Sequence, residues 1–200
     1  MLGERYLQNT VKILESLSSE IPAVKQAAEL CAKAAIDGSS VYVYDKSGII
    51  DNEMVDRASG LALFRKLSTS REKIASGDVV IIASIYENDA DDMKIAATAH
   101  ENGAKLIVLA SKGQLYDKAD IAVSSGSSGN NGVIEVAGVE KPFCPVSGII
   151  NATLAWSIVA ETAAYLLNSD KTPTVYTGRY LKDGFEKFQN AQREFTSKGF

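Results

Sequence analysis

Runs of apolar residues divide the chain into segments of two kinds. Apolar positions three or four residues apart predict helices, and short uninterrupted apolar runs predict strands that are covered on both faces. Patterns of the helical kind cover residues 6–17, 22–36, 49–67, 89–101, 147–167 and 181–198. Runs of the strand kind cover 41–44, 79–83, 106–110 and 121–123, with 133–136 as a fifth or edge strand. Strands that alternate with helices are typical of a parallel sheet with helices on both faces.

This order predicts one α/β domain, a three-layer α-β-α sandwich of the flavodoxin-like kind with a mostly parallel sheet of about five strands. We expect the chain to divide into N-terminal helices, an α/β core and C-terminal helices, at residues 1–36, 40–137 and 146–200. The terminal helices then form arms on the core. In open parallel sheets, ligands bind beyond the carboxyl ends of the strands. The site is therefore expected on the loops at 45–48, 84–89, 111–115 and 124–132.

Composition narrows the class of protein. Of the 200 residues, 46% are hydrophobic and 23% are charged, as in ordinary soluble globular proteins. The formal net charge of −4 implies no basic face, so we expect neither nucleic acid nor an anionic membrane surface as a partner. The N-terminus lacks the apolar stretch of a signal peptide, and Cys31 and Cys144 are widely spaced. These features favour a cytoplasmic protein with reduced thiols.

One predicted helix is about as long as a membrane span. The segment Gly148–Leu167 is mostly apolar, but it contains Asn151 and Glu161. An ionised Glu inside a lone span is costly. The segment is therefore interpreted as a buried core helix or a helix at a subunit interface.

Several short motifs occur in the order found in one known family. They are Tyr42–Tyr44 leading into Ser47-Gly48, Glu53-Met54, Arg57–Leu61, Gly77–Ser84, Asn102–Leu109, Leu115–Ile121 and Ser157–Glu161. Over nearly the whole chain they resemble sugar isomerase (SIS) domain proteins, especially small bacterial proteins related to phosphoheptose isomerases. The resemblance implies a fold of this type, homodimers or homotetramers, and recognition of sugar phosphates. Some members of that family isomerise the sugar, and others only sense it.

The segment after the 79–83 strand departs from the family pattern. The family holds phosphate with a Ser/Thr-rich loop at a helix start, where hydroxyls and backbone N–H groups face the anion. Here Ser84 matches, but Tyr86 and Glu87 replace a Ser and a Gly. Three acids then fill the first helical turn: Asp89, Asp91 and Asp92. They act only as helix caps, or they also repel a phosphate, since like charges about 4 Å apart cost about 4 kcal/mol at an effective dielectric constant of ~20.

The remaining ligand-binding candidates lie on the same loops. The first loop is shorter than the family pattern, and it supplies Ser47 and Gly48. The second loop supplies Ser84, Asn88 and Asp89, and the Ser/Gly/Asn loop at 124–132 supplies Ser124. Ser147 is expected to cap the long helix, and the resemblance also places a hydroxyl there near the ligand.

The residues for isomerase chemistry are incomplete. Aldose–ketose isomerisation needs a base to move a proton and an acid to assist ring opening. Glu53 matches a catalytic Glu of phosphoheptose isomerases and is the candidate catalytic residue. Those enzymes also place a His on the last core helix, whereas Ala155-Trp156-Ser157 has none. The only histidine, His100, is expected on the surface, and one His with two distant Cys gives no metal-ligand spacing, so we expect no metal or other cofactor.

Three hypotheses of function follow. The first is a binding module that senses a small sugar derivative, and the second is a phosphosugar isomerase of the phosphoheptose type with a changed site. The third is an assembly protein with a vestigial site, in which apolar segments form a subunit interface. Those segments are Ile149–Leu167 and the tail aromatics Tyr180, Phe185, Phe188 and Phe195. The sequence favours the binding module over the isomerase, and the isomerase over the assembly protein.

Overall fold

A five-stranded parallel sheet forms the centre of the computed structural model, which describes residues 1–68, 73–86, 88–126 and 132–200. The strands run in the order β2-β1-β3-β4-β5, all parallel. Their bounds are Val41–Tyr44 (β1), Phe64–Lys66 (β2), Val79–Ala83 (β3), Lys105–Ala110 (β4) and Ile121–Ser124 (β5). Two further short strands, β6 (Gly132–Ile134) and β7 (Phe143–Pro145), form a separate antiparallel pair.

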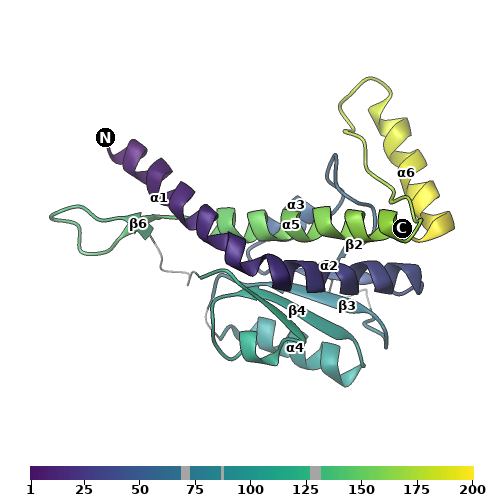
Figure 1. The fold of residues 1–200 in the computed structure, drawn as a ribbon, viewed down its shortest axis with the longest axis horizontal. Coiled ribbons are helices and arrows are strands. Elements are labelled where there is room, and N and C mark those ends of the chain that lie inside the picture. Colours follow the sequence, from purple (N-terminus) through teal and green to yellow (C-terminus); the bar gives the residue numbers. More distant parts are fainter. Residues whose placement is uncertain (69–72, 87, 127–131) are drawn as a thin grey trace.

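Helices lie on both faces of the sheet, as Figure 1 shows. The α-helices are α1 (Leu2–Ser16), α2 (Ile21–Ile36), α3 (Ile49–Met54), α4 (Ala90–Glu101), α5 (Ser147–Asn168) and α6 (Gly184–Lys198). Short 3-10 turns occupy Leu17–Glu20 (η1) and Tyr116–Lys118 (η2). Helices α2 and α5 cover one face of the sheet, and α4 covers the other. The predicted three-layer α/β fold is confirmed.

The uninterrupted apolar runs are explained by burial on both faces. In β3, Val79, Ile81 and Ala83 point into the core beneath α2 and α5. The alternate residues Val80 and Ile82 pack in the core beneath α4. Because successive side chains of a strand point to opposite faces, a strand covered on both sides needs an apolar residue at every position.

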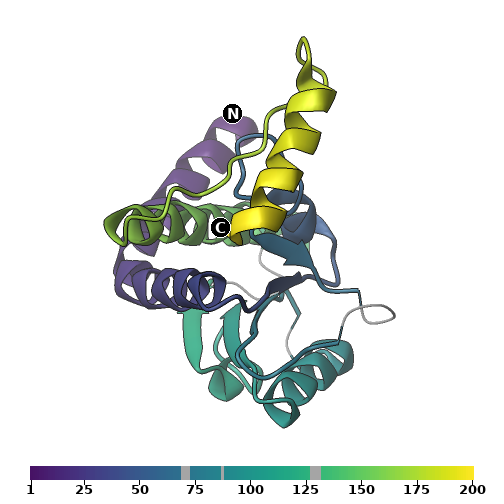
Figure 2. The ribbon, with the colours of Figure 1, turned by 90° about the vertical axis from the view of Figure 1, so that its right-hand side faces the viewer.

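The terminal helices form arms that extend beyond the sheet (Figures 1 and 2). The α1 arm contacts the β6 region, where the Asn9 side-chain amide donates to the Val133 carbonyl at 2.8 Å. At the other end, α6 packs its Phe188 ring on Tyr176, with ring centroids 4.5 Å apart. The predicted helical arms are therefore present, and each is held by specific contacts.

The predicted helix over residues 49–67 is wrong beyond its first six residues. Helix α3 ends at Met54, Val55 is extended, and Asp56 and Ser59 have positive φ angles of 53° and 66°. A left-handed backbone conformation interrupts a right-handed helix. The chain then enters β2, whose Phe64 is buried beside β1.

The prediction that residues 133–136 form a fifth or edge strand also needs correction. This segment does not join the main sheet; Gly132–Ile134 pairs with Phe143–Pro145 instead. The two short strands approach each other closely at Gly132, where a Cβ atom would lie 2.3 Å from the backbone nitrogen of Phe143. The fifth strand of the main sheet is β2, which falls within the segment that the apolar pattern predicts to be helical.

Helix α5 is the one described helix that is long and apolar enough to span a membrane by length and composition. Its most apolar 18-residue window has a mean hydropathy of 1.3, and 44% of that window is buried. Ile150, Leu154 and Ile158 of α5 lie in the core that α5 shares with α2 and the sheet. Core helices of soluble proteins have the same composition, so this feature is weak support for a membrane location.

Candidate functional site

The strand order defines where the predicted loops meet. The chain leaves β1 toward β2 on one side and leaves β3 toward β4 on the other. Because β1 and β3 are adjacent and parallel, with Tyr44 beside Ile82, their carboxyl ends lie together. This is the topological switch point at which open α/β sheets bind ligands. We call residues 45–48, 84–86 and 88–92 the β1–β3 site.

Asp45 organises the first loop of this site. Its buried carboxylate accepts hydrogen bonds from the Ser47 backbone N–H at 2.8 Å and the Ile50 backbone N–H at 2.7 Å. The Ser47 hydroxyl also donates to it, at 2.7 Å. Gly48 precedes α3 with a φ of 75°, a conformation that favours glycine. The Ser47 hydroxyl hydrogen is therefore already used within the chain.

Ser84 faces an acid rather than solvent. Only 3% of Ser84 is exposed, and its hydroxyl donates to the Asp92 carboxylate. The second carboxylate oxygen of Asp92 has no hydrogen-bond partner in the part of the chain that the structure describes. Burial raises the pKa of Asp92, and the hydrogen bond from Ser84 opposes that shift. The side-chain amide of Asn151 on α5 donates to the Ser84 carbonyl at 3.4 Å.

A lysine from the first loop closes on the acids of the second. The Lys46 ammonium lies 2.8 Å from carboxylate oxygens of both Asp89 and Asp91. Hydrogen bonds to these acids raise the pKa of Lys46, and the same contact lowers the pKa of Asp89. Asp89 also caps α4 by accepting from the Asp91 backbone N–H at 2.9 Å. The expected capping role of the acids is confirmed for Asp89.

The other predicted ligand residues lie around this centre. Asn88, with a φ of 57°, lines a small hollow of about 40 Å³ with Tyr86 and the loop after β4. Ser124 ends β5, and its backbone N–H donates to Glu20 at 2.8 Å. It lines a different hollow, of about 290 Å³, beside η1. Residues 127–131 of the predicted Ser/Gly/Asn loop, and Glu87, lie outside the described residues.

The prediction that Ser147 caps α5 is wrong. The helix begins at Ser147 itself, Val146 occupies the capping position, and no side chain caps that end. A side chain at the first helical position points in a different direction from one at the capping position. The Ser147 hydroxyl therefore does not accept hydrogen bonds from the unpaired backbone N–H groups at the start of α5. Ser147 is buried, with 6% of its surface exposed.

Glu53 makes its contacts with residues outside the β1–β3 site. Its carboxylate accepts from the Trp156 indole N–H at 3.2 Å and lies 2.9 Å from the Arg57 guanidinium. The structure thus brings Glu53 to the helical stretch where the resemblance places a His. An indole N–H is a donor only, so Trp156 cannot take up a proton as imidazole does. Glu53 and Trp156 line a wide, shallow hollow of about 620 Å³ along α5.

His100 is exposed near the end of α4, where it lies 3.7 Å from Asp120, so the expected surface position is confirmed. Cys31 is buried in α2 and Cys144 is partly buried, and both are free thiols. Within the described ranges, no group of three or more His, Cys, Asp or Glu residues has an arrangement that could hold a metal ion.

Two polar residues were not among the predicted ligand-binding residues: Asp45, on the predicted loop at 45–48, and Asn151 of α5, which contacts the β1–β3 site at Ser84. A signal for Asp45 was available, because it follows β1 directly and precedes a Ser-Gly pair. Asn151 gave none, since it lies within an apolar helical pattern and meets Ser84 only through the packing of α5 on the sheet.

Comparison with solved structures identifies the fold as that of sugar isomerase domains. Phosphoheptose isomerase from Neisseria gonorrhoeae is 15% identical, with a TM-score of 0.57 over 82% of this chain and 98% of that one. The sugar isomerase domain of an RpiR transcription factor from Sphaerobacter thermophilus is 16% identical, with a TM-score of 0.57 over 98% of both chains. An Escherichia coli CFT073 protein in complex with a sugar phosphate is 17% identical, with a TM-score of 0.56 over 84% of this chain and 95% of that one.

Within this fold, the chain belongs to a family described as a domain of unknown function, DUF2529, whose model matches residues 9–130. A UPF0309 protein from Listeria innocua is 25% identical over 92% of each chain. Neither description states an activity.

Proposed function

We propose that this protein is a non-catalytic sugar isomerase-type domain that binds a small sugar derivative at the β1–β3 site. The observation that carries this proposal is the meeting of the Lys46 and Asp89 side chains across the carboxyl ends of β1 and β3. That position is the ligand side of open α/β sheets. The sugar-phosphate complex of the similar Escherichia coli protein supports a sugar phosphate or a related compound as the ligand class.

The accessible groups of the site suit hydroxyls better than a phosphate. Asp91 is exposed, Asp89 is partly exposed, and carboxylates accept hydrogen bonds from sugar hydroxyls. Tyr86 is 47% exposed and offers an aromatic face. By contrast, the Ser84 hydroxyl is buried on Asp92, and Lys46 is already balanced by two acids. A phosphate at this loop would have to displace these contacts.

The contacts of Glu53 support binding without isomerisation. Glu53 contacts Trp156 and Arg57, and neither residue exchanges a proton readily near neutral pH. The isomerase is the second hypothesis. It requires ketose–aldose turnover that Glu53→Gln abolishes, measured by NMR over a panel of sugar phosphates.

Binding is tested by thermal shift and calorimetry with matched pairs of sugars and their phosphates. We expect a saturable shift with at least one sugar derivative, and we expect Asp89→Asn to weaken binding about tenfold, because a charge-assisted hydrogen bond is lost. Asp117→Asn is the matched control, since Asp117 is an exposed acid on η2 and is not one of the residues of the β1–β3 site. No shift with any sugar, or equal losses in both variants, would contradict the proposal.

We also propose that the protein is cytoplasmic and forms homodimers or homotetramers. The exposed apolar residues Ile149 and Leu167 on α5 support an interface on that helix, as do Tyr180 and Phe185 in the tail. Sedimentation velocity at micromolar concentration tests this assembly, and a monomer there would contradict it. A stable oligomer without any sugar binding would instead favour the assembly protein.

A further inference from the structure

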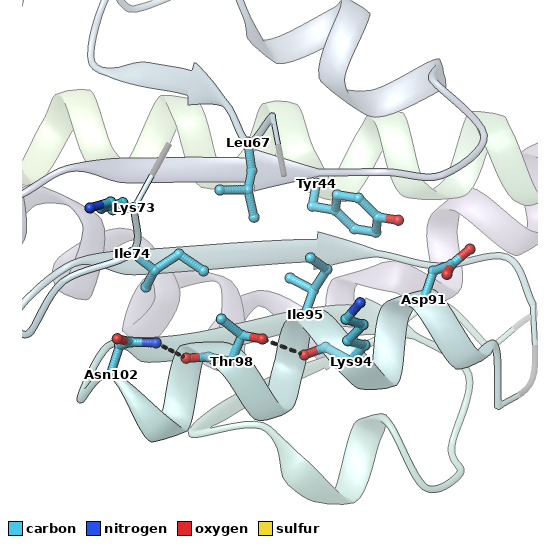
Figure 3. Close-up of a pocket in the computed structure, with 9 residues that line it drawn as sticks. All are labelled: Tyr44, Leu67, Lys73, Ile74, Asp91, Lys94, Ile95, Thr98 and Asn102. Carbon is cyan, nitrogen blue, oxygen red and sulfur yellow. Dashed lines mark hydrogen bonds between the residues drawn. The ribbon is translucent and has the colours of Figure 1, made fainter. Parts of the chain in front are cut away.

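A second hollow lies on the other side of Asp91, between α4 and the connection from β2 to β3. It has a volume of about 710 Å³, within the range of about 300–1,000 Å³ typical of small-molecule sites. Lys94, Ile95 and Thr98 of α4 line one wall, and Leu67 and Ile74 line the other, with Tyr44 at one end (Figure 3). We call this hollow the α4 groove.

The groove follows from how the chain returns from β2 to β3. Both strands are parallel to β1, so the connection must run back to the amino end of the sheet. In most parallel sheets a helix makes this return and covers the sheet. The described parts of this connection, residues 67–68 and 73–78, contain no helix. Leu67 and Ile74, from these described parts, line the hollow together with residues of α4.

Two lysines line the groove: Lys94 on α4, and Lys73 at the end away from Tyr44 (Figure 3). Lys94 is exposed and is the cation at the Tyr44 end. Its side chain rises from α4 beside Ile95, and its ammonium points toward Tyr44 (Figure 3). Among the described residues, no carboxylate lies within ion-pair distance of that ammonium. The neighbouring acid, Asp91, contacts Lys46 at 2.8 Å instead.

The Tyr44 hydroxyl adds a second polar group at the same end of the groove. Burial and the charge of Asp92 raise the pKa of Tyr44, so its hydroxyl stays protonated at neutral pH. A protonated phenol donates a hydrogen bond. The end of the groove near Lys94 thus offers a positive charge and a donor, while Leu67, Ile74 and Ile95 offer apolar walls.

We infer that the α4 groove binds a small organic anion with an apolar or aromatic body. Lys94 and the Tyr44 hydroxyl hold the carboxylate or phosphate group, and the body lies between Ile95 and Leu67. This site is separate from the proposed sugar site, because its charged anchor is Lys94 and not Lys46.

The test uses the fluorescent anion 8-anilinonaphthalene-1-sulfonate on the full chain. We expect saturable binding that Lys94→Gln weakens about tenfold, the loss of one charge-assisted contact. Thr98→Phe fills the groove and is expected to abolish binding. Lys118→Gln is the matched control, because Lys118 is an exposed lysine on η2 outside the groove. Circular dichroism checks folding, and Lys94→Gln carries the test alone if Thr98→Phe is unfolded.

Competition with octanoate and phenyl phosphate identifies the anionic group. Displacement of the dye by either compound supports the inference and says whether a carboxylate or a phosphate is preferred. Absence of saturable dye binding, displacement by neither compound, or equal affinities in Lys94→Gln and Lys118→Gln would overturn it. Sugar binding at the β1–β3 site is measured separately in Asp89→Asn, so failure of one proposal is distinct from failure of the other.

Discussion

The β1–β3 site and the α4 groove meet at Asp91, yet their polar groups are used in opposite ways. In the β1–β3 site, Lys46 contacts two acids and the Ser84 hydroxyl donates to Asp92. In the α4 groove, Lys94 is exposed at the Tyr44 end and pairs with no described acid. Strand topology therefore locates a site, but the contacts made within the chain decide which groups remain available to a ligand.

The largest expected effect that tests this comparison is on the first loop. Asp45→Ala leaves the partly buried backbone N–H of Ser47 and the buried backbone N–H of Ile50 without their acceptor. We expect the free energy of unfolding to fall by about 2–4 kcal/mol, because two charge-assisted hydrogen bonds are lost. Urea denaturation measures it. Asp117→Ala should leave stability unchanged, and an equally small effect of Asp45→Ala would mean that the loop is not held by Asp45.

The second effect concerns the buried contact between Ser84 and Asp92. Ser84→Ala removes the hydroxyl that donates to the Asp92 carboxylate. We expect a loss of about 1–3 kcal/mol in the free energy of unfolding, the cost of leaving a buried polar group unpaired. In an Asp92→Asn background the same change should cost less, because the two residues are coupled. Equal costs in both backgrounds would contradict a coupling between the Ser84 hydroxyl and Asp92.

The third effect separates two acids of the same helical turn by pH. Burial raises the pKa of Asp92, so the folded state binds this proton more tightly than the unfolded chain does. Its stabilising contribution is complete below the ordinary value of 3.8 and is lost as pH rises through the folded-state pKa. We therefore expect Asp92→Asn to raise Tm relative to the natural chain more at pH 7 than at pH 4, by on the order of 2–4 °C.

Asp89 should show the opposite pH dependence. The hydrogen bond from Lys46 lowers the pKa of Asp89, so its contribution is present above 3.8 and is lost as pH falls through the lower folded-state pKa. Asp89→Asn should thus lower Tm more at pH 7 than near pH 3. Thermal melts of the natural chain and both variants over this range measure the difference, and parallel Tm curves would contradict the assignment.

The smallest effect compares the same substitution in the two regions. Lys46→Gln removes contacts to Asp89 and Asp91, so it should lower Tm slightly, and salt should reduce the difference. Lys94→Gln should leave Tm unchanged at any salt concentration, since its ammonium makes no ion pair in the described structure. A larger loss for Lys94→Gln would place a hidden partner in the α4 groove.

Strands buried on both faces were the most predictable part of the fold. Val79–Ala83 carries its own signal, because every position must be apolar. Phe64–Lys66 carries almost none: it is three residues long, and Arg65 and Lys66 are exposed at the sheet edge. The segment before it pairs with the tail, where the Tyr176 backbone N–H donates to the Gly60 carbonyl, a contact between segments far apart in the chain.

The sequence by itself determined the α/β fold, the loops at the ends of β1 and β3, and the presence of acids in the first turn of α4. Those features depend on residues close together in the chain, whose apolar spacing and capping propensity act locally. Only the tertiary structure decided that Ser84 is buried against Asp92. It also decided that the Lys46 side chain reaches Asp89 and that the Lys94 side chain does not reach it. Such pairings depend on how separate elements pack, and side-chain contacts over long sequence separations leave no local pattern.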